Sequence, residues 1–280
     1  MAQLFFISDI HGSVDLLKEI IEYNIDFDCP QTHLYTLGDY VDGNPYNKNT
    51  NSFLTLNYLF ELQSKYPNQV TCLLGNHDCW LGYYLAPERF PLLSTTLRPS
   101  IETLQDFITE EEFMAVYTEA NSKERSQVEF VNFVYDKLRD VIGKKHAALI
   151  DRLAQLPYFV ETKDFIAVHA GVVEIENCYE AWKTVSDENT FLMKYPVEKS
   201  LFYKPLIAGH IGTHEIACNP DFHDIYCYGN HIFLDSTIIK SGYLNLLKYD
   251  TETKVFTGIK KERHQWIEYR IVDALKHDMM

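Results

Sequence analysis

The 280-residue sequence lacks any run of about eighteen consecutive apolar residues, which excludes a membrane-spanning helix. It also lacks a CxxC pair. Its six cysteines are scattered, so we expect reduced thiols with no disulfide framework. The N-terminus enters an apolar segment without a basic region or a cleavage site. We therefore expect no secretory signal and a cytoplasmic location.

Positive charge is scarce. The chain has 25 lysines and arginines against 40 aspartates and glutamates, giving a formal net charge of −15. Such an acidic surface repels the phosphate backbone, so we expect no long nucleic acid as a partner. Small phosphorylated molecules remain possible, because metal ions would invert the field inside a cleft. The expected partners are a phosphorylated protein or a small phosphorylated or nucleotide substrate, with no membrane.

Against this background, five short motifs contain side chains that bind metals. They are Ser8-Asp9-Ile10-His11-Gly12, Gly38-Asp39-Tyr40-Val41-Asp42-Gly43, Gly75-Asn76-His77-Asp78, His169-Ala170-Gly171 and Gly209-His210. Each one follows an apolar run that reads as a strand. Because five such motifs occur in order, a site for two divalent metals is a far better explanation than polar residues collecting in loops.

Strands and helices alternate along the first part of the chain. Apolar runs at 4–7, 33–37 and 70–74 predict strands, and residues 14–21 and 52–62 have helical spacing. This βαβαβ order predicts a largely parallel sheet, with the first three motifs at the carboxyl ends of its strands. Further strands are expected at 165–168 and 206–208, followed by short β segments between 231 and 257. The fold class is therefore α/β.

The pattern changes between residues 81 and 145, where three charged, amphipathic segments read as helices. We interpret 81–145 as a helical insertion that caps one metal-binding domain spanning 1–280. Another helix at 149–156 should end at Pro157.

The ligand types suit Mn, Fe or Zn better than Ca or Mg, and the sequence does not decide among them. Asp9 and His11, separated by one residue, can hold one metal together. Asp39 is the best candidate for a bridging carboxylate, which two metals about 3.5–4 Å apart require. Second-metal ligands would come from three later motifs: Asn76, His169 and His210.

A general acid is also present among these residues. His77 follows Asn76 directly and cannot easily reach the same metal, so we expect it to face the substrate and protonate the leaving oxygen. A carboxylate such as Asp42 would fix its tautomer. The nucleophile would be a metal-bound hydroxide that attacks phosphorus.

These motifs resemble those of the calcineurin-like metallophosphoesterase superfamily. Within it they are nearest to bacterial serine/threonine protein phosphatases and symmetrical diadenosine tetraphosphatases. That branch carries GDxHG, GDxVDRG, GNHE, HAG or HGG, and GHT in this order. The resemblance covers about residues 3–250. It implies a four-layer α/β/β/α sandwich with a helical insertion, two metals held by the same ligands, and the same roles for His77 and Asp42.

One position departs from the family pattern. The arginine of GDxVDRG, which grips the substrate phosphate, is replaced by Gly43, so a bidentate clamp is missing. By a loose alignment with a second family arginine, Lys194 could serve as a point-charge substitute in substrate binding.

The sequence therefore predicts a dimetal-dependent phosphoesterase, with a serine/threonine-type phosphomonoesterase as the first hypothesis. A dinucleoside polyphosphate hydrolase or phosphodiesterase is the alternative among enzymes. A non-catalytic binding module that retains the fold is the alternative from another class. The presence of every expected ligand counts against the binding module.

Overall fold

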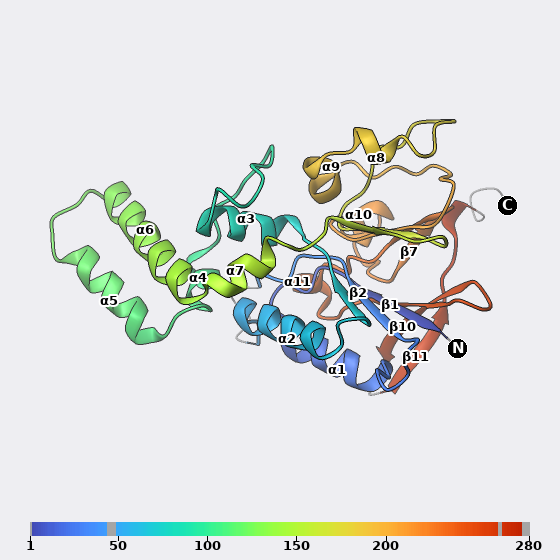
Figure 1. Ribbon diagram of the computed structural model, residues 1–280, viewed down its shortest axis with the longest axis horizontal. Helices are drawn as coiled ribbons and strands as arrows, with labels where there is room; N and C mark the ends of the chain where they lie inside the picture. The colour runs from blue at the N-terminus through green and yellow to red at the C-terminus, as the bar shows by residue number, and fades with distance from the viewer. Residues whose placement is uncertain (1, 44–48, 263–264, 276–280) are drawn as a thin grey trace.

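The computed structural model describes residues 2–43, 49–262 and 265–275, and its centre consists of two β-sheets (Figure 1). The first sheet has the strand order β11-β10-β9-β1-β2-β3. Its strands are β1 (Gln3–Ile7), β2 (His33–Thr36), β3 (Val70–Cys72), β9 (Leu246–Asp250), β10 (Val255–Glu262) and β11 (Gln265–Arg270).

Only half of this sheet is parallel. Strand β1 pairs in parallel with β2, and β2 with β3, but β9 pairs antiparallel with both β1 and β10, and β10 pairs antiparallel with β11. The predicted parallel arrangement is confirmed for β1, β2 and β3, and it does not extend to β9, β10 and β11. The reason lies in the connections, because strands joined by short links, as β9 to β11 are, run antiparallel, whereas parallel neighbours need a crossover helix.

The second sheet has the order β4-β5-β6-β8-β7. Strands β5, β6 and β8 are parallel at its centre, and β4 and β7 are antiparallel at its edges. Its strands are β4 (Phe159–Glu161), β5 (Ile166–Val168), β6 (Leu206–Ala208), β7 (Tyr226–Tyr228) and β8 (His231–Phe233).

Alternation along the strands explains how the layers stack. In β1, Phe6 packs with side chains of both sheets, while Phe5 and Ile7 belong to a cluster on the opposite face. In β6, Ile207 joins the cluster between the sheets, and Leu206 packs on the other face. Successive side chains of a strand point to opposite faces, so each sheet contributes one face to a shared core. Helices cover the two outer faces and complete the four-layer α/β/β/α sandwich.

Helices α1 (Val14–Asn24) and α2 (Ser52–Lys65) lie against the first sheet (Figure 1). Helix α1 buries Leu17, Ile20 and Ile21, whose spacing places them on one face. Four short helices lie in the loops that follow strands β5, β6 and β8 of the second sheet. They are α8 (Trp182–Val185), α9 (Glu188–Met193), α10 (Thr213–Ile216) and α11 (Ile238–Ser241).

The middle of the chain is helical, in agreement with the sequence pattern. Its elements are α3 (Asn76–Leu85), α4 (Ile101–Gln105), α5 (Glu110–Asn121), α6 (Gln127–Lys145) and α7 (Ala147–Leu153). Helices α5 and α6 begin with capping boxes at Thr109 and Ser126 and extend away from both sheets (Figure 1). The inner part of α6, including Leu138, packs into the same apolar cluster as β1. The division into one domain with an insertion at 81–145 stays a prediction.

All six cysteines are free thiols. Within the described ranges, none of the helices has the length and apolar character needed to cross a bilayer.

Candidate metal centre

The two sheets bring the predicted ligands together at the carboxyl ends of their parallel strands. Asp9 and Asp39 follow β1 and β2 in the first sheet, and His169 and His210 follow β5 and β6 in the second. Asn76 is the first residue of α3, directly after the loop that leaves β3. Parallel strands end at the same edge of a sheet, so residues distant in sequence become neighbours.

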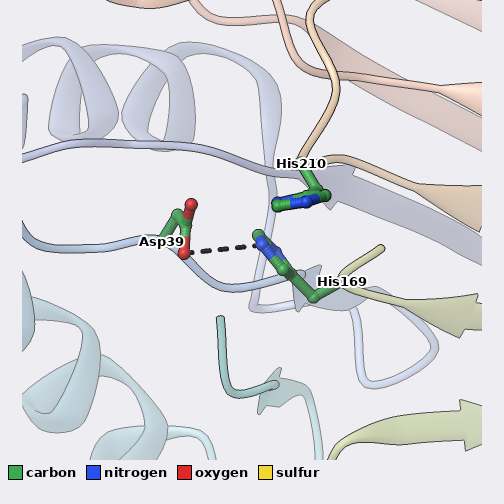
Figure 2. A group of neighbouring side chains, drawn as sticks. All are labelled: Asp39, His169 and His210. Atoms are coloured by element: carbon green, nitrogen blue, oxygen red, sulfur yellow. Dashed lines mark ion pairs between the residues drawn. The ribbon is translucent and has the colours of Figure 1, made fainter. Parts of the chain in front are cut away.

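Two groups of possible ligands share one carboxylate. Asp39 lies with His169 and His210 in one group and with Asp9 and His11 in the other, and within each group the ligand atoms lie within 4.8 Å of one another. Figure 2 shows the side chains of the first group converging from their separate strand ends. The Asp39 Oδ1 atom is 3.5 Å from Nε2 of His169. This sharing is what a bridging role of Asp39 requires.

The hydrogen bonds of His169 indicate that a cation belongs beside it. Its Nδ1 lies 2.8 Å from the carbonyl oxygen of Leu37, which can only accept, so Nδ1 carries the proton. Burial lowers the pKa of this imidazole, which is therefore neutral. Its Nε2 then presents a lone pair, yet that atom faces the side-chain oxygen of Asn76 at 2.8 Å. Two acceptors aimed at one point fit a metal ion between or beside them.

Asn76 and His11 repeat this arrangement. The same Asn76 oxygen is 2.9 Å from Nδ1 of His210. The Nδ1 atom of His11 lies 3.0 Å from the carbonyl oxygen of Val41, which leaves a lone pair on Nε2, and this Nε2 atom is 3.9 Å from Asp39 Oδ2. The donor set of carboxylate, amide oxygen and neutral imidazole therefore fits two divalent cations of the kind that accept mixed oxygen and nitrogen ligands.

Electrostatics supports the same conclusion. Burial, followed by the nearby carboxylates of Asp235 and Asp39, raises the pKa of Asp9 well above its ordinary value. Burial lowers the pKa of His210 to about 3. Buried carboxylates packed this closely are costly unless positive charge compensates them.

The backbone is held in unusual conformations to make the site. Four of the proposed ligands have positive φ: Asp9 at 55°, His11 at 45°, Asp39 at 57° and His210 at 67°. Such angles are uncommon for residues other than glycine and cost energy, and they occur most often at functional sites. Position 209 must be glycine because the Asp9 side chain lies close to its backbone, and a Cβ there would be 2.1 Å from Asp9 Oδ2.

His77 and Asp42 form a pair beside the shared carboxylate. The Nδ1 atom of His77 lies 2.8 Å from Asp42 Oδ2, and its Nε2 lies 4.0 Å from Asp39 Oδ2. Asp42 is fixed in turn by Thr103 of α4, whose hydroxyl donates to Oδ1 at 2.6 Å. The helical region therefore supports the site through Thr103, a residue that sequence reasoning missed because it lies 61 positions from Asp42.

Asp78 was also missed as a supporting residue. Its carboxylate is buried and accepts the backbone N–H groups of Asp39, Tyr40 and Gly75 at 2.8, 2.9 and 3.0 Å. It thereby ties the loop that carries Asp39 to the first turn of α3. The signal was present in the sequence, because an acidic residue at the third position of a helix can accept the backbone N–H of the residue that precedes the helix.

Lys194 lies beside the loop that follows His169, and its role in substrate binding stays a prediction. Its ammonium donates to the carbonyl oxygen of Val172 and forms ion pairs with Glu198 at 3.1 Å and Glu174 at 3.5 Å. Its aliphatic stem passes over Gly171, where an added Cβ would lie 2.6 Å from Lys194 Cδ. The stem of Lys194 therefore packs beside the loop of His169. Its ammonium group, which the loose alignment predicted to bind substrate, is paired with Glu174 and Glu198.

Comparison with known proteins assigns this chain to a family. The family model described as calcineurin-like phosphoesterase matches residues 2–214, and the chain belongs to this family. The resemblance drawn from its motifs is confirmed.

Individual relatives match less completely. A protein phosphatase 2A catalytic subunit of Dictyostelium discoideum is 38% identical over 72 residues, which is 26% of this chain and 21% of that protein. The chain therefore matches only about a fifth of that relative's length. A cold-active protein tyrosine phosphatase structure aligns with 97% of this chain and 79% of its own, at 11% identity and a TM-score of 0.54. A second such structure, from a psychrophilic Shewanella species, covers 96% of this chain and 80% of its own, at 14% identity and a TM-score of 0.52. At these identities the two structures show a shared fold.

Proposed function

We propose that this chain is a dimetal phosphomonoesterase of the serine/threonine type. Asp9, His11 and Asp39 would hold one metal, and Asp39 with Asn76, His169 and His210 the other, as a mixed oxygen and nitrogen ligand set. When bound, the two metals would supply Lewis-acid stabilisation of the phosphoryl oxygens and a nucleophile at neutral pH. The other steps depend on residues of the chain itself.

The observation that carries the proposal is the His77–Asp42 pair beside the shared carboxylate. Burial lowers the pKa of His77, but the carboxylates of Asp39 and Asp42 outweigh it and raise that pKa to about 9. Cations bound at Asp39 would oppose this effect and bring the pKa back towards neutrality. With Nδ1–H donated to Asp42, the second proton of the imidazolium sits on Nε2, which lies on the side of the metal ligands. His77 is thus placed to protonate the departing oxygen of an ester.

A phosphomonoester of a protein is favoured over a dinucleoside polyphosphate by the surroundings of the site. The cavity whose wall includes His11 has no phenylalanine, tyrosine or tryptophan among its lining residues in the described part of the chain. Trp80, whose ring centroid is 4.6 Å from that of His77, is only 7% exposed. A nucleobase in this cavity would therefore find no aromatic ring in its described wall on which to stack. The partial match to the catalytic chain of a protein phosphatase 2A supports the same choice.

A panel of three substrates tests this function. The metal-loaded protein is assayed with a phosphoserine peptide, a bis(nitrophenyl) phosphodiester and diadenosine tetraphosphate, each with and without Mn²⁺. We expect metal-stimulated release of phosphate from the peptide at the highest kcat/KM. Cleavage of the diester or of the dinucleotide alone would reject the phosphomonoesterase and favour the alternative hydrolases. No metal-stimulated hydrolysis of any ester would favour the binding-module hypothesis.

A further inference from the structure

A cavity of about 470 Å³ lies beside the metal centre, between α1, the loop before α2, and α11. Its wall includes His11, so it begins at one of the proposed metal ligands. The cavity therefore meets the metal centre at its His11 end. The charged side chains of the cavity wall can therefore act on the substrate.

Lys240 of α11 is the one lysine or arginine among the described residues that line this cavity. Its side chain is exposed. The Nζ atom is 3.5 Å from Nε2 of His214, which is longer than an ordinary hydrogen bond of about 2.7–3.2 Å. An ammonium has three donors on a flexible stem, so Lys240 can turn towards an anion in the cavity at little cost.

Two other positions that might have supplied a cation are closed to this role. A Cβ at Gly43 would lie 2.6 Å from Cβ of Thr50 and 3.0 Å from the carbonyl oxygen of His11, so the fold leaves no space for a side chain there. Lys194 is engaged by Glu174 and Glu198.

The acidic residues of the cavity wall do not neutralise the positive charge of Lys240. Asp15 and Glu19 both line the cavity from α1. Glu19, however, is already paired with Lys261. Among the described residues of the wall, the carboxylate of Asp15 is then the negative charge that opposes Lys240 and the two divalent metals of the loaded protein. Bound divalent metals at the His11 end would add positive charge to that of Lys240.

We infer that Lys240 binds the anionic phosphoryl group of the substrate, as the cation that this chain uses where its relatives carry the arginine of GDxVDRG. This inference rests on the proposed function and deepens it. Lys240 contributes a mobile point charge in place of a rigid fork. Such a contact holds the ground state and the transition state about equally, so it acts on substrate affinity more than on the chemical step.

The test uses metal-loaded wild type, Lys240→Met, Lys240→Arg and Lys123→Met. Lys123 is an exposed lysine between α5 and α6 and serves as the control for loss of one surface charge. With a phosphoserine peptide, Lys240→Met should raise KM about tenfold, with kcat within about twofold of wild type. The inhibition constant of inorganic phosphate should rise by a similar factor. Lys240→Arg should recover most of both, and Lys123→Met should leave both unchanged.

Unchanged KM and phosphate inhibition in Lys240→Met would overturn the inference, as would an equal change in Lys123→Met. A lower kcat with unchanged KM would also overturn it, because that result assigns Lys240 to a different step. Failure of the proposed function is distinguishable. If wild type hydrolyses no ester, calorimetric titration of metal-loaded wild type and Lys240→Met with inorganic phosphate still tests the contact, and equal affinities would reject it.

Discussion

Replacing His77 with alanine tests the assignment of the general acid. The change removes the imidazole whose Nδ1 lies 2.8 Å from Asp42 Oδ2 and leaves every proposed metal ligand in place. We expect kcat for a phosphoserine peptide to fall by about 10²–10⁴, the usual contribution of general acid catalysis. At 1.36 kcal/mol for each factor of ten, this corresponds to about 3–5 kcal/mol of activation free energy.

The size of the loss should depend on the leaving group. A serine alkoxide needs a proton as it departs, whereas nitrophenolate is a stable anion and needs little help. The loss of kcat should therefore be much smaller with nitrophenyl phosphate than with the peptide. Metal content, measured by plasma mass spectrometry on the purified variant, should stay at the wild-type level.

Two results would refute this reasoning. Equal losses on both substrates with metal retained would show that His77 does not protonate the leaving oxygen. A collapse of the metal content would show that His77 belongs to the ligand set or organises it. Asp42→Asn is a matched variant, since it keeps the shape of the pair but removes the charge, and it should show the same dependence on leaving group with a smaller loss.

Three further predictions follow from the contacts at the site and beside it. Asp39→Asn should lower the content of both metals, measured by plasma mass spectrometry, because both ligand groups share this carboxylate; loss of only one metal would argue against a bridge. Asp78→Asn should lower the free energy of unfolding of the metal-free protein by about 1–3 kcal/mol in urea titration, because an amide cannot accept all three backbone N–H groups. Burial raises the pKa of Glu174, but the hydrogen bond and the charge of His231, together with the hydrogen bond from Ser200, outweigh it and lower the pKa to about 2, below the ordinary value of 4.5. The ionised Glu174 side chain therefore stabilises the folded protein fully above about pH 4.5, and this stabilisation is lost as the pH falls towards about 2. A Glu174→Gln variant should remove this part of the pH dependence of the free energy of unfolding.

The helices and central strands could be predicted because local periodicity encodes them. The spacing of Leu17, Ile20 and Ile21 marks the buried face of α1, and the apolar run before Asp9 marks β1. The antiparallel half of the first sheet was not predictable in the same way. A strand such as β9 carries no local sign of its partner, and its pairing with β1 joins residues about 245 positions apart, as Leu4 and Tyr249 show.

The site shows the same division. The order of the motifs identified the residues that now lie around Asp39, because each chemistry-bearing residue follows an apolar strand. The supporting contacts lay beyond sequence reasoning. Thr103 reaches Asp42 from the helical region, and the tautomer of His169 depends on the carbonyl oxygen of Leu37, a backbone group that has no sequence signature.

The sequence by itself determined the kinds of ligand, their order, and their positions at strand ends, because side-chain chemistry and strand periodicity are local properties. Only the tertiary structure decided which atoms face one another. Packing two sheets through a shared core brings Asp39 of one sheet within 3.5 Å of His169 of the other. The same packing fills the space at Gly43 and leaves Lys240 in the wall of the cavity, because these outcomes depend on contacts between segments far apart in the chain.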